Sequence, residues 1–108
     1  MEVYDIFLNT PLGKKRGELR VNIENGKLIG FLSLFGHTEL IEGTVDENGK
    51  CLLAGKFITL LNTVSFSADG VINHDILNLK VKSGGSVYEM EGVIYDIEGV
   101  PQRRKEES

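Results

Sequence analysis

Four polar side chains have the best prospect of doing chemistry, because the strand pattern described below turns them inward: Glu39, Asn73, Asp75 and Tyr88. A buried carboxylate is costly unless paired, and carboxylates with shifted pKa values gather at functional sites. If Glu39 and Asp75 met at one opening, they would hydrogen-bond a ligand or act as general acid and base. Alternatively, both lie near strand ends, where an inward side chain reaches solvent. The four are predicted to bind a ligand, and no catalytic residue is predicted.

The cysteine and the two histidines give weaker signals. Cys51 is the only thiol, so no intrachain disulfide can form, which fits a reducing compartment. It is predicted inside, as a small hydrophobic residue with a raised pKa. His37 is predicted in a turn and His74 on the outer face of a strand, without a second His or Cys at ligand spacing. The expectation is a protein without metal or cofactor that is not an enzyme.

Composition and charge narrow the class of protein. The chain has 108 residues, enough for one domain, and a net charge of −4, which disfavours nucleic acid as a partner. Its basic clusters, residues 14–16 in a predicted loop and residues 103–105 in a tail, are interpreted as solvated charge. Neither a signal peptide nor an apolar run long enough to span a membrane is found, so the expected location is the cytoplasm, without membrane partners.

Period-2 alternation of apolar and polar residues runs through the whole chain and predicts an all-β protein. Asn-Gly, Asp-Gly and Gly-Gly pairs mark hairpin turns at residues 25–26, 48–49, 69–70 and 84–85. The Thr-Pro-Leu-Gly segment at residues 10–13 is predicted to be a loop, and one further turn is placed near residues 60–62 by elimination. About eight antiparallel strands follow, at residues 2–9, 17–24, 27–35, 38–46, 50–58, 62–68, 71–82 and 86–97.

The turns also predict how neighbouring strands pair. A two-residue turn at Asn25-Gly26 places Glu24 opposite Lys27, and one at Gly36-His37 places Gly30 opposite Gly43. A two-residue turn at Gly84-Gly85 places Lys80 opposite Glu89, and the hydrophobic pattern around Asn48-Gly49 predicts a type I turn with a bulge at Gly49. The register puts four mid-strand glycines on the inner face: Gly30, Gly43, Gly55 and Gly92.

Inward glycines relieve crowding where a sheet coils sharply. The predicted fold is therefore an up-and-down meander closing into a small barrel, with a β-sandwich or half-open roll as the alternative. One barrel domain is expected over residues 1–98, followed by a flexible charged C-terminal tail at residues 99–108.

The opening segment YDIFLNTPLGKKRGELRV and the mid-strand glycines of LIG, IEG, LAG and MEG carry a resemblance. Over residues 3–97 the chain resembles small bacterial lipocalin-like, calycin-type barrels, many of them uncharacterised. The chain lacks the Gly-x-Trp that lipocalins carry near the first strand, because it contains no Trp. The resemblance implies a barrel whose lumen would carry a small apolar ligand.

The outer face of the third to fifth strands is predicted to hold five apolar side chains: Ile29, Phe31, Phe35, Leu40 and Leu52. A contiguous exposed apolar patch usually marks an interface. The prediction is a non-enzymatic module that self-associates, as a symmetric homodimer, or docks to another protein. The alternative function is a lipocalin-like carrier of a small apolar ligand, held by inward residues at the rim.

Overall fold

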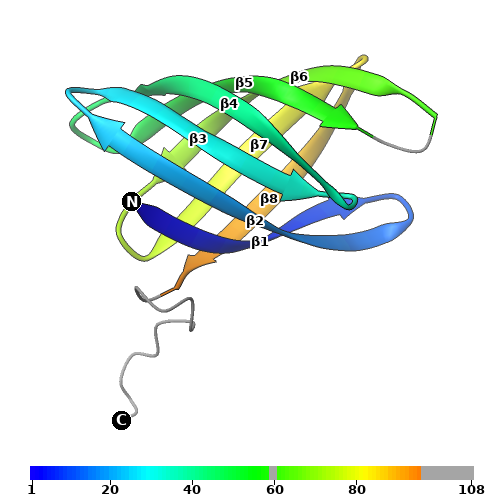
Figure 1. The fold of residues 1–108 in the computed structure, drawn as a ribbon, viewed down its shortest axis with the longest axis horizontal. Coiled ribbons are helices and arrows are strands. Elements are labelled where there is room, and N and C mark those ends of the chain that lie inside the picture. Colours follow the sequence, from blue (N-terminus) through cyan, green and yellow to red (C-terminus); the bar gives the residue numbers. More distant parts are fainter. Residues whose placement is uncertain (59–60, 96–108) are drawn as a thin grey trace, which may run out of the picture.

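The computed structural model describes residues 1–58 and 61–95, and these form a closed barrel of eight antiparallel strands (Figure 1). Among these residues there is no helix, and hence none long and apolar enough to cross a membrane. The strands are β1 Glu2–Thr10, β2 Gly13–Glu24, β3 Lys27–Leu34, β4 His37–Val45, β5 Lys50–Ile58, β6 Thr63–Ile72, β7 Ile76–Ser83 and β8 Ser86–Ile94.

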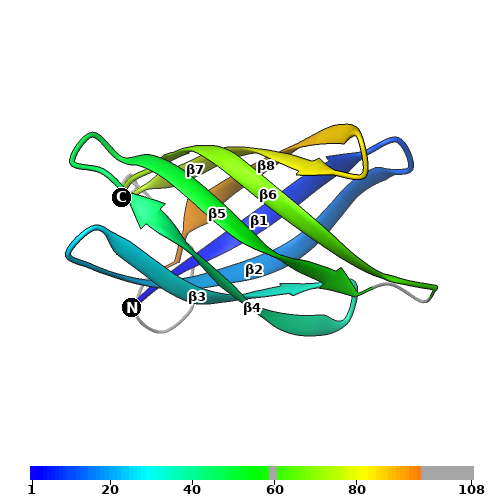
Figure 2. The same ribbon diagram turned by 90° about the horizontal axis from the view of Figure 1, so that it is seen from above.

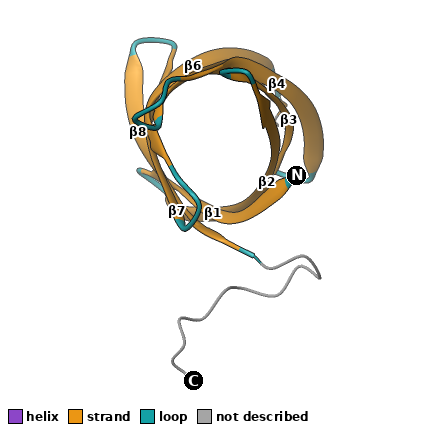
Figure 3. Ribbon diagram, turned by 90° about the vertical axis from the view of Figure 1, so that its left-hand side faces the viewer, coloured by secondary structure: helices purple, strands orange, loops and turns teal. Residues whose placement is uncertain are grey.

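Each strand pairs with its neighbour in the chain, and β1 pairs with β8 from Tyr4 opposite Ile94 to Asn9 opposite Glu89. This last ladder joins the first strand to the last, and Figure 3, viewed along the long axis of the molecule, shows the resulting ring of strands. Closure confirms the predicted up-and-down barrel and excludes the sandwich and the half-open roll. It also pairs β1 with β8, the two strands that would be the edges of an open sheet.

The hairpin turns alternate between the two ends of the barrel (Figure 2). The turns after β1, β3, β5 and β7 lie at one end, here called the mouth end. The turns after β2, β4 and β6 lie at the other, here called the tyrosine end because Tyr4 is buried there. A residue's distance from its nearest turn therefore shows which opening it can reach.

Three hairpins have the predicted register. Glu24 lies opposite Lys27, and Lys80 lies opposite Glu89 across the Gly84-Gly85 turn. In the β4–β5 hairpin, the amide of Gly49 donates to the carbonyl of Asp46, and Gly49 has a φ of 85°. This is the predicted type I turn with a glycine bulge, and it turns the side chains of β5 to the expected faces.

The β3–β4 turn is displaced from its predicted position. It consists of Phe35-Gly36, so Gly30 lies opposite Ile41 and not opposite Gly43 as predicted. Both turn residues have positive φ, 57° and 79°, and glycine takes the second place as it does in Asn25-Gly26. A turn at Gly36-His37 would have placed His37 there. Because the error is two residues in register, the inner and outer faces are unchanged.

The Asp69-Gly70 pair is not a turn, contrary to the prediction. β6 continues through it to Ile72, with Asp69 opposite Lys80 and Gly70 opposite Leu79. The inward positions Phe66, Ala68, Gly70 and Ile72 keep alternating across this pair, and the side chains of all except the glycine are buried. The chain reverses three residues later, over residues 73–75.

Two further boundaries differ from the sequence prediction. β2 begins at Gly13 and not at residue 17, so the basic cluster of residues 14–16 lies in a strand and not in a loop. β8 ends at Ile94, although the amide of Tyr95 still donates to the carbonyl of Val3. The predicted tail and part of the predicted turn near residues 60–62 lie outside the described residues.

The interior of the barrel is filled with apolar side chains from all eight strands. They extend from Tyr4 and Ile72 near one end to Leu8 and Phe57 near the other, and no polar residue other than Tyr4 is buried in the described part of the chain. The predicted inward glycines bring strands close together. An ideal Cβ at Gly30 would overlap the carbonyl oxygen of Arg20 on β2. Glycine at this position therefore allows the coiling that a small barrel requires.

Candidate functional site

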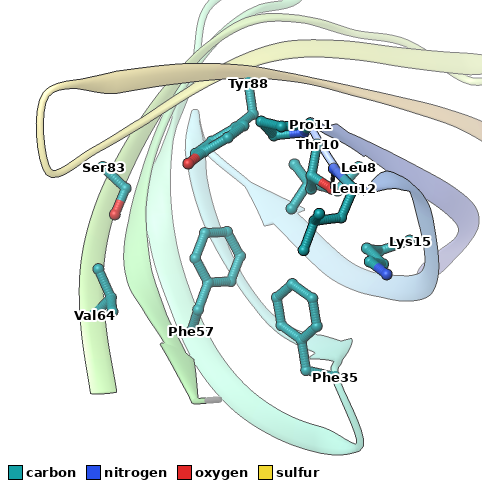
Figure 4. Close-up of a pocket in the computed structure, with 10 residues that line it drawn as sticks. All are labelled: Leu8, Thr10, Pro11, Leu12, Lys15, Phe35, Phe57, Val64, Ser83 and Tyr88. Atoms are coloured by element: carbon teal, nitrogen blue, oxygen red, sulfur yellow. Dashed lines mark hydrogen bonds between the residues drawn. The ribbon is translucent and has the colours of Figure 1, made fainter. Parts of the chain in front are cut away.

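The mouth end holds an open pocket of about 370 Å³, which we call the mouth (Figure 4). Ligand pockets in proteins commonly have volumes of about 300–1,000 Å³ and mostly apolar walls. The lining residues come from six strands and two turns, so the pocket is a feature of the whole barrel end: Leu8, Thr10, Pro11, Leu12, Lys15, Phe35, Phe57, Val64, Ser83 and Tyr88.

Aromatic rings form one side of the mouth. The ring of Phe57 stacks on that of Phe66, with centroids 4.4 Å apart, and meets Phe35 edge-on at 5.9 Å. Figure 4 shows the Phe35 ring facing the Phe57 ring from the β3–β4 turn. Phe35 was predicted on the outer face, and this is wrong because its positive φ at the turn breaks the strand alternation. The result is a rigid apolar wall open to solvent.

Lys15 adds a positive charge to this wall. It lies opposite Leu8 in the β1–β2 ladder, and it follows the same inward alternation as Gly17 and Leu19. Its side chain is partly buried and lines the mouth, whereas Lys14 and Arg16 point outward and place their cations over the ring of Phe7. In the described part of the chain, no carboxylate lies within 4.0 Å of the Lys15 ammonium.

The hydroxyl groups of the mouth differ in whether they already have partners. The Thr10 hydroxyl donates to the carbonyl of Gly13 at 2.7 Å, and the Ser83 hydroxyl donates to the carbonyl of Ser65 at 3.0 Å. The Tyr88 hydroxyl has no hydrogen-bond partner among the described residues, and Figure 4 shows it pointing into the pocket. Lys15 and Tyr88 are therefore the side-chain donors of the mouth that remain available to a ligand.

The tyrosine end holds a second open pocket, of about 320 Å³, and hydrogen bonds already occupy several of the polar groups that line it. The Tyr4 hydroxyl donates to the carbonyl of Asn73 at 2.5 Å, and burial, followed by the nearby charge of Glu2, raises its pKa. The Asn73 side-chain oxygen accepts from the amides of Asp75 and Ile76 at 2.8 and 2.9 Å. His74 contacts Glu2 at 3.0 Å and is otherwise exposed. These contacts explain Asn73 as a turn-forming residue.

The structure divides the four predicted ligand-binding residues between the two ends. Tyr88 lines the mouth, and Glu39, opposite Leu32 on the same half of the barrel, lines a groove between β4 and β5. Asn73 and Asp75 lie in the β6–β7 turn at the tyrosine end, and not in a strand as predicted. Glu39 and Asp75 consequently do not meet at one opening.

The outer face of β3 and β4 carries part of the predicted patch. Phe31 lies opposite Leu40, with exposed fractions of 45% and 51%. Ile29, two residues before Phe31 on β3, is also exposed on this face. Leu52 on β5 is also exposed, but it lies opposite Thr44, and Glu42 lies opposite Ile29. Polar side chains thus separate Leu52 from the other three residues, and the contiguous surface is Ile29, Phe31 and Leu40.

Other reactive groups are either isolated or inaccessible. Cys51 is fully buried on β5, and burial raises the pKa of its thiol to about 11. His37 was predicted in a turn but is the first residue of β4. His74 was predicted in a strand but lies in the β6–β7 turn. In residues 1–58 and 61–95, no group of three or more His, Cys, Asp or Glu is placed to hold a metal ion.

Comparison of the chain with known proteins found no match among family models, curated proteins or solved structures.

Most residues that line the mouth were not predicted as site residues, and Lys15 is the charged one among them. The signal was present, because extending the alternation of Leu19 backwards through Gly17 places residue 15 on the inner face. It was overlooked because the Thr-Pro-Leu-Gly segment and the run of three basic residues were assigned to a single loop. The strand in fact begins directly after the turn, and this separates one inward cation from its two outward neighbours.

Proposed function

We propose that the protein binds a small, largely apolar ligand in the mouth of its barrel. The observation that carries this proposal is the open pocket of about 370 Å³ at the mouth end, whose apolar wall is formed by Phe35, Phe57 and Leu8. An apolar ligand that displaces water from an exposed aromatic cavity of this size lowers the free energy of the system. The pocket at the opposite end, of about 320 Å³, has a more polar lining that includes Glu2, Asp46 and Glu47. Among the described residues, Tyr4 is the one phenyl-type ring in its wall.

Binding of the neutral fluorophore N-phenyl-1-naphthylamine tests this proposal. The wild-type protein is expected to bind one equivalent with an increase in fluorescence. Val64→Trp, on the wall of the mouth, is expected to abolish binding because the larger ring occupies the pocket. Val87→Trp is the matched control, since Val87 lies near the same end of the barrel with an exposed fraction of 58% and does not line the mouth.

Two results would contradict the proposal. One is a wild-type protein that does not bind the fluorophore, and the other is a Val64→Trp variant that binds it as well as wild type does. Circular dichroism of both tryptophan variants shows whether the barrel is retained, so a loss of binding caused by unfolding is recognised.

A second candidate function is self-association through the outer face of β3 and β4. It is favoured by the exposed cross-strand pair of Phe31 and Leu40, flanked by Ile29. Two copies placed face to face would cover these side chains, as in the symmetric interface of a homodimer.

Sedimentation velocity tests self-association, because it distinguishes a dimer of this protein from a monomer. The wild-type protein is expected to sediment as a dimer, and Phe31→Asp as a monomer because a charge would be buried in the interface. Val87→Asp, on the outer face of β8, is the control and is expected to leave the dimer intact. A wild-type protein that stays monomeric, with Phe31→Asp no more soluble, would count against self-association.

A further inference from the structure

We infer that the ligand of the mouth is an organic anion and that the Lys15 ammonium binds its charged group, an inference that rests on the proposed binding function. The chain carries a net charge of −4, yet the charged side chain that lines this pocket is a lysine. Charge complementarity in a partly buried site favours a ligand with an apolar body and one carboxylate or sulfonate group.

Partial burial distinguishes Lys15 from the other lysines and arginines of the described residues, whose side chains are exposed whether or not they have a carboxylate partner. Arg16 forms a two-point ion pair with Asp5, in which both N–O distances are 2.9 Å, and Arg20 pairs with Glu18. Lys82 lies 3.4 Å from Asp69. Lys15 lacks any such partner in residues 1–58 and 61–95, although its side chain is partly buried against an apolar wall. An anion in the mouth would supply the missing partner.

The position of Lys15 also fits the shape of such a ligand. Figure 4 shows it on the side of the pocket where Leu12 and Phe35 lie, and of the two phenylalanine rings in the wall that of Phe57 is buried and that of Phe35 exposed. An amphipathic ligand would place its apolar body against the phenylalanine rings and its charged group at the rim. The unpartnered hydroxyl of Tyr88 is available as a second donor to the same ligand.

A matched pair of probes tests the inference. N-phenyl-1-naphthylamine is neutral, and 8-anilinonaphthalene-1-sulfonate has the same ring system with one sulfonate. The wild-type protein is expected to bind the sulfonate about tenfold more tightly, because a hydrogen bond to a charged group contributes more than one between neutral groups. The preference is measured as the ratio of the two affinities within one variant. Lys15→Gln is expected to lose this preference, and Lys15→Arg to keep it.

Lys14→Gln is the matched control, since Lys14 is the outward neighbour of Lys15 on the same strand. It removes the same charge from the chain and is expected to keep the preference for the sulfonate. If the neutral probe binds but the sulfonate is not preferred, or if Lys15→Gln and Lys14→Gln behave alike, the anion inference is overturned and the proposed function stands. If neither probe binds the wild type, the proposed function fails as well.

Discussion

Replacing single inward glycines by alanine tests whether close approach of strands is what these residues permit. An alanine Cβ at Gly30 would overlap the carbonyl oxygen of Arg20 and lie 3.0 Å from the Cα of Val21, both backbone atoms of β2. No side-chain rotation relieves such contacts. At Gly55 the new methyl would instead meet side chains, 2.7 Å from the Cγ2 of Ile41 and 3.1 Å from two ring carbons of Phe66. These groups can move without displacing a strand.

The expected magnitudes follow from these contacts. Overpacking costs about 1–3 kcal/mol, and alanine recovers about 0.4–1 kcal/mol by reducing the entropy of the unfolded chain. Gly30→Ala should therefore lower the free energy of unfolding by about 2 kcal/mol, near the upper end of the range. Gly55→Ala should lower it by less than about 1 kcal/mol. The difference corresponds to roughly 5–15 °C in the midpoint of thermal unfolding.

Urea denaturation followed by far-ultraviolet circular dichroism measures both free energies under one condition. Equal slopes of unfolding free energy against urea concentration would show that the two variants expose the same amount of surface on unfolding. The reasoning is refuted if Gly55→Ala loses as much stability as Gly30→Ala or more, since the backbone contact at β2 would then have no special weight.

Two further outcomes follow from buried groups. Burial raises the pKa of the Cys51 thiol from 9.0 to about 11. As pH rises, the thiol of the unfolded chain therefore loses its proton before that of the folded protein does. The free energy of unfolding should fall between pH 9 and about pH 11, by up to about 3 kcal/mol. In Cys51→Ala the fall should be smaller, and equal pH slopes in the two proteins would disprove the assignment. Tyr4→Phe should cost about 1–2 kcal/mol and speed hydrogen exchange at the amide of Asn73, because the carbonyl of that residue loses its donor; unchanged stability would contradict this.

The barrel itself was predictable because two signals agreed along most of the chain. Asn25-Gly26 and Gly84-Gly85 adopt the positive φ values that two-residue hairpin turns require, and the flanking alternation places the same faces inward. Where the signals disagreed, the alternation prevailed. Asp69-Gly70 has the composition of a turn, but reversing the chain there would have removed Ile72 from the inner face of β6. Asp69 instead faces outward and pairs with Lys82.

The candidate site was less predictable, because it depends on the residues at which the alternation starts or stops. Phe35 leaves the strand pattern at a turn with positive φ, and its ring moves from the expected outer face to the wall of the mouth. Lys15 enters the pattern earlier than expected and becomes an inward cation. Each change depends on a strand boundary, and boundaries are set by turn geometry and pairing rather than by the composition of the strand.

A barrel end is built from such boundaries, and this has a physical consequence for function. Mid-strand positions of this barrel are fixed by packing, since any inward side chain there must fit among the buried neighbours of adjacent strands. At the mouth, Leu12 and Tyr88 face a pocket open to solvent, so polar and charged groups can point inward without the cost of full burial. The end of the barrel is therefore where an inward cation such as Lys15 is physically tolerated, and where the side chains that line a pocket can change without altering the fold.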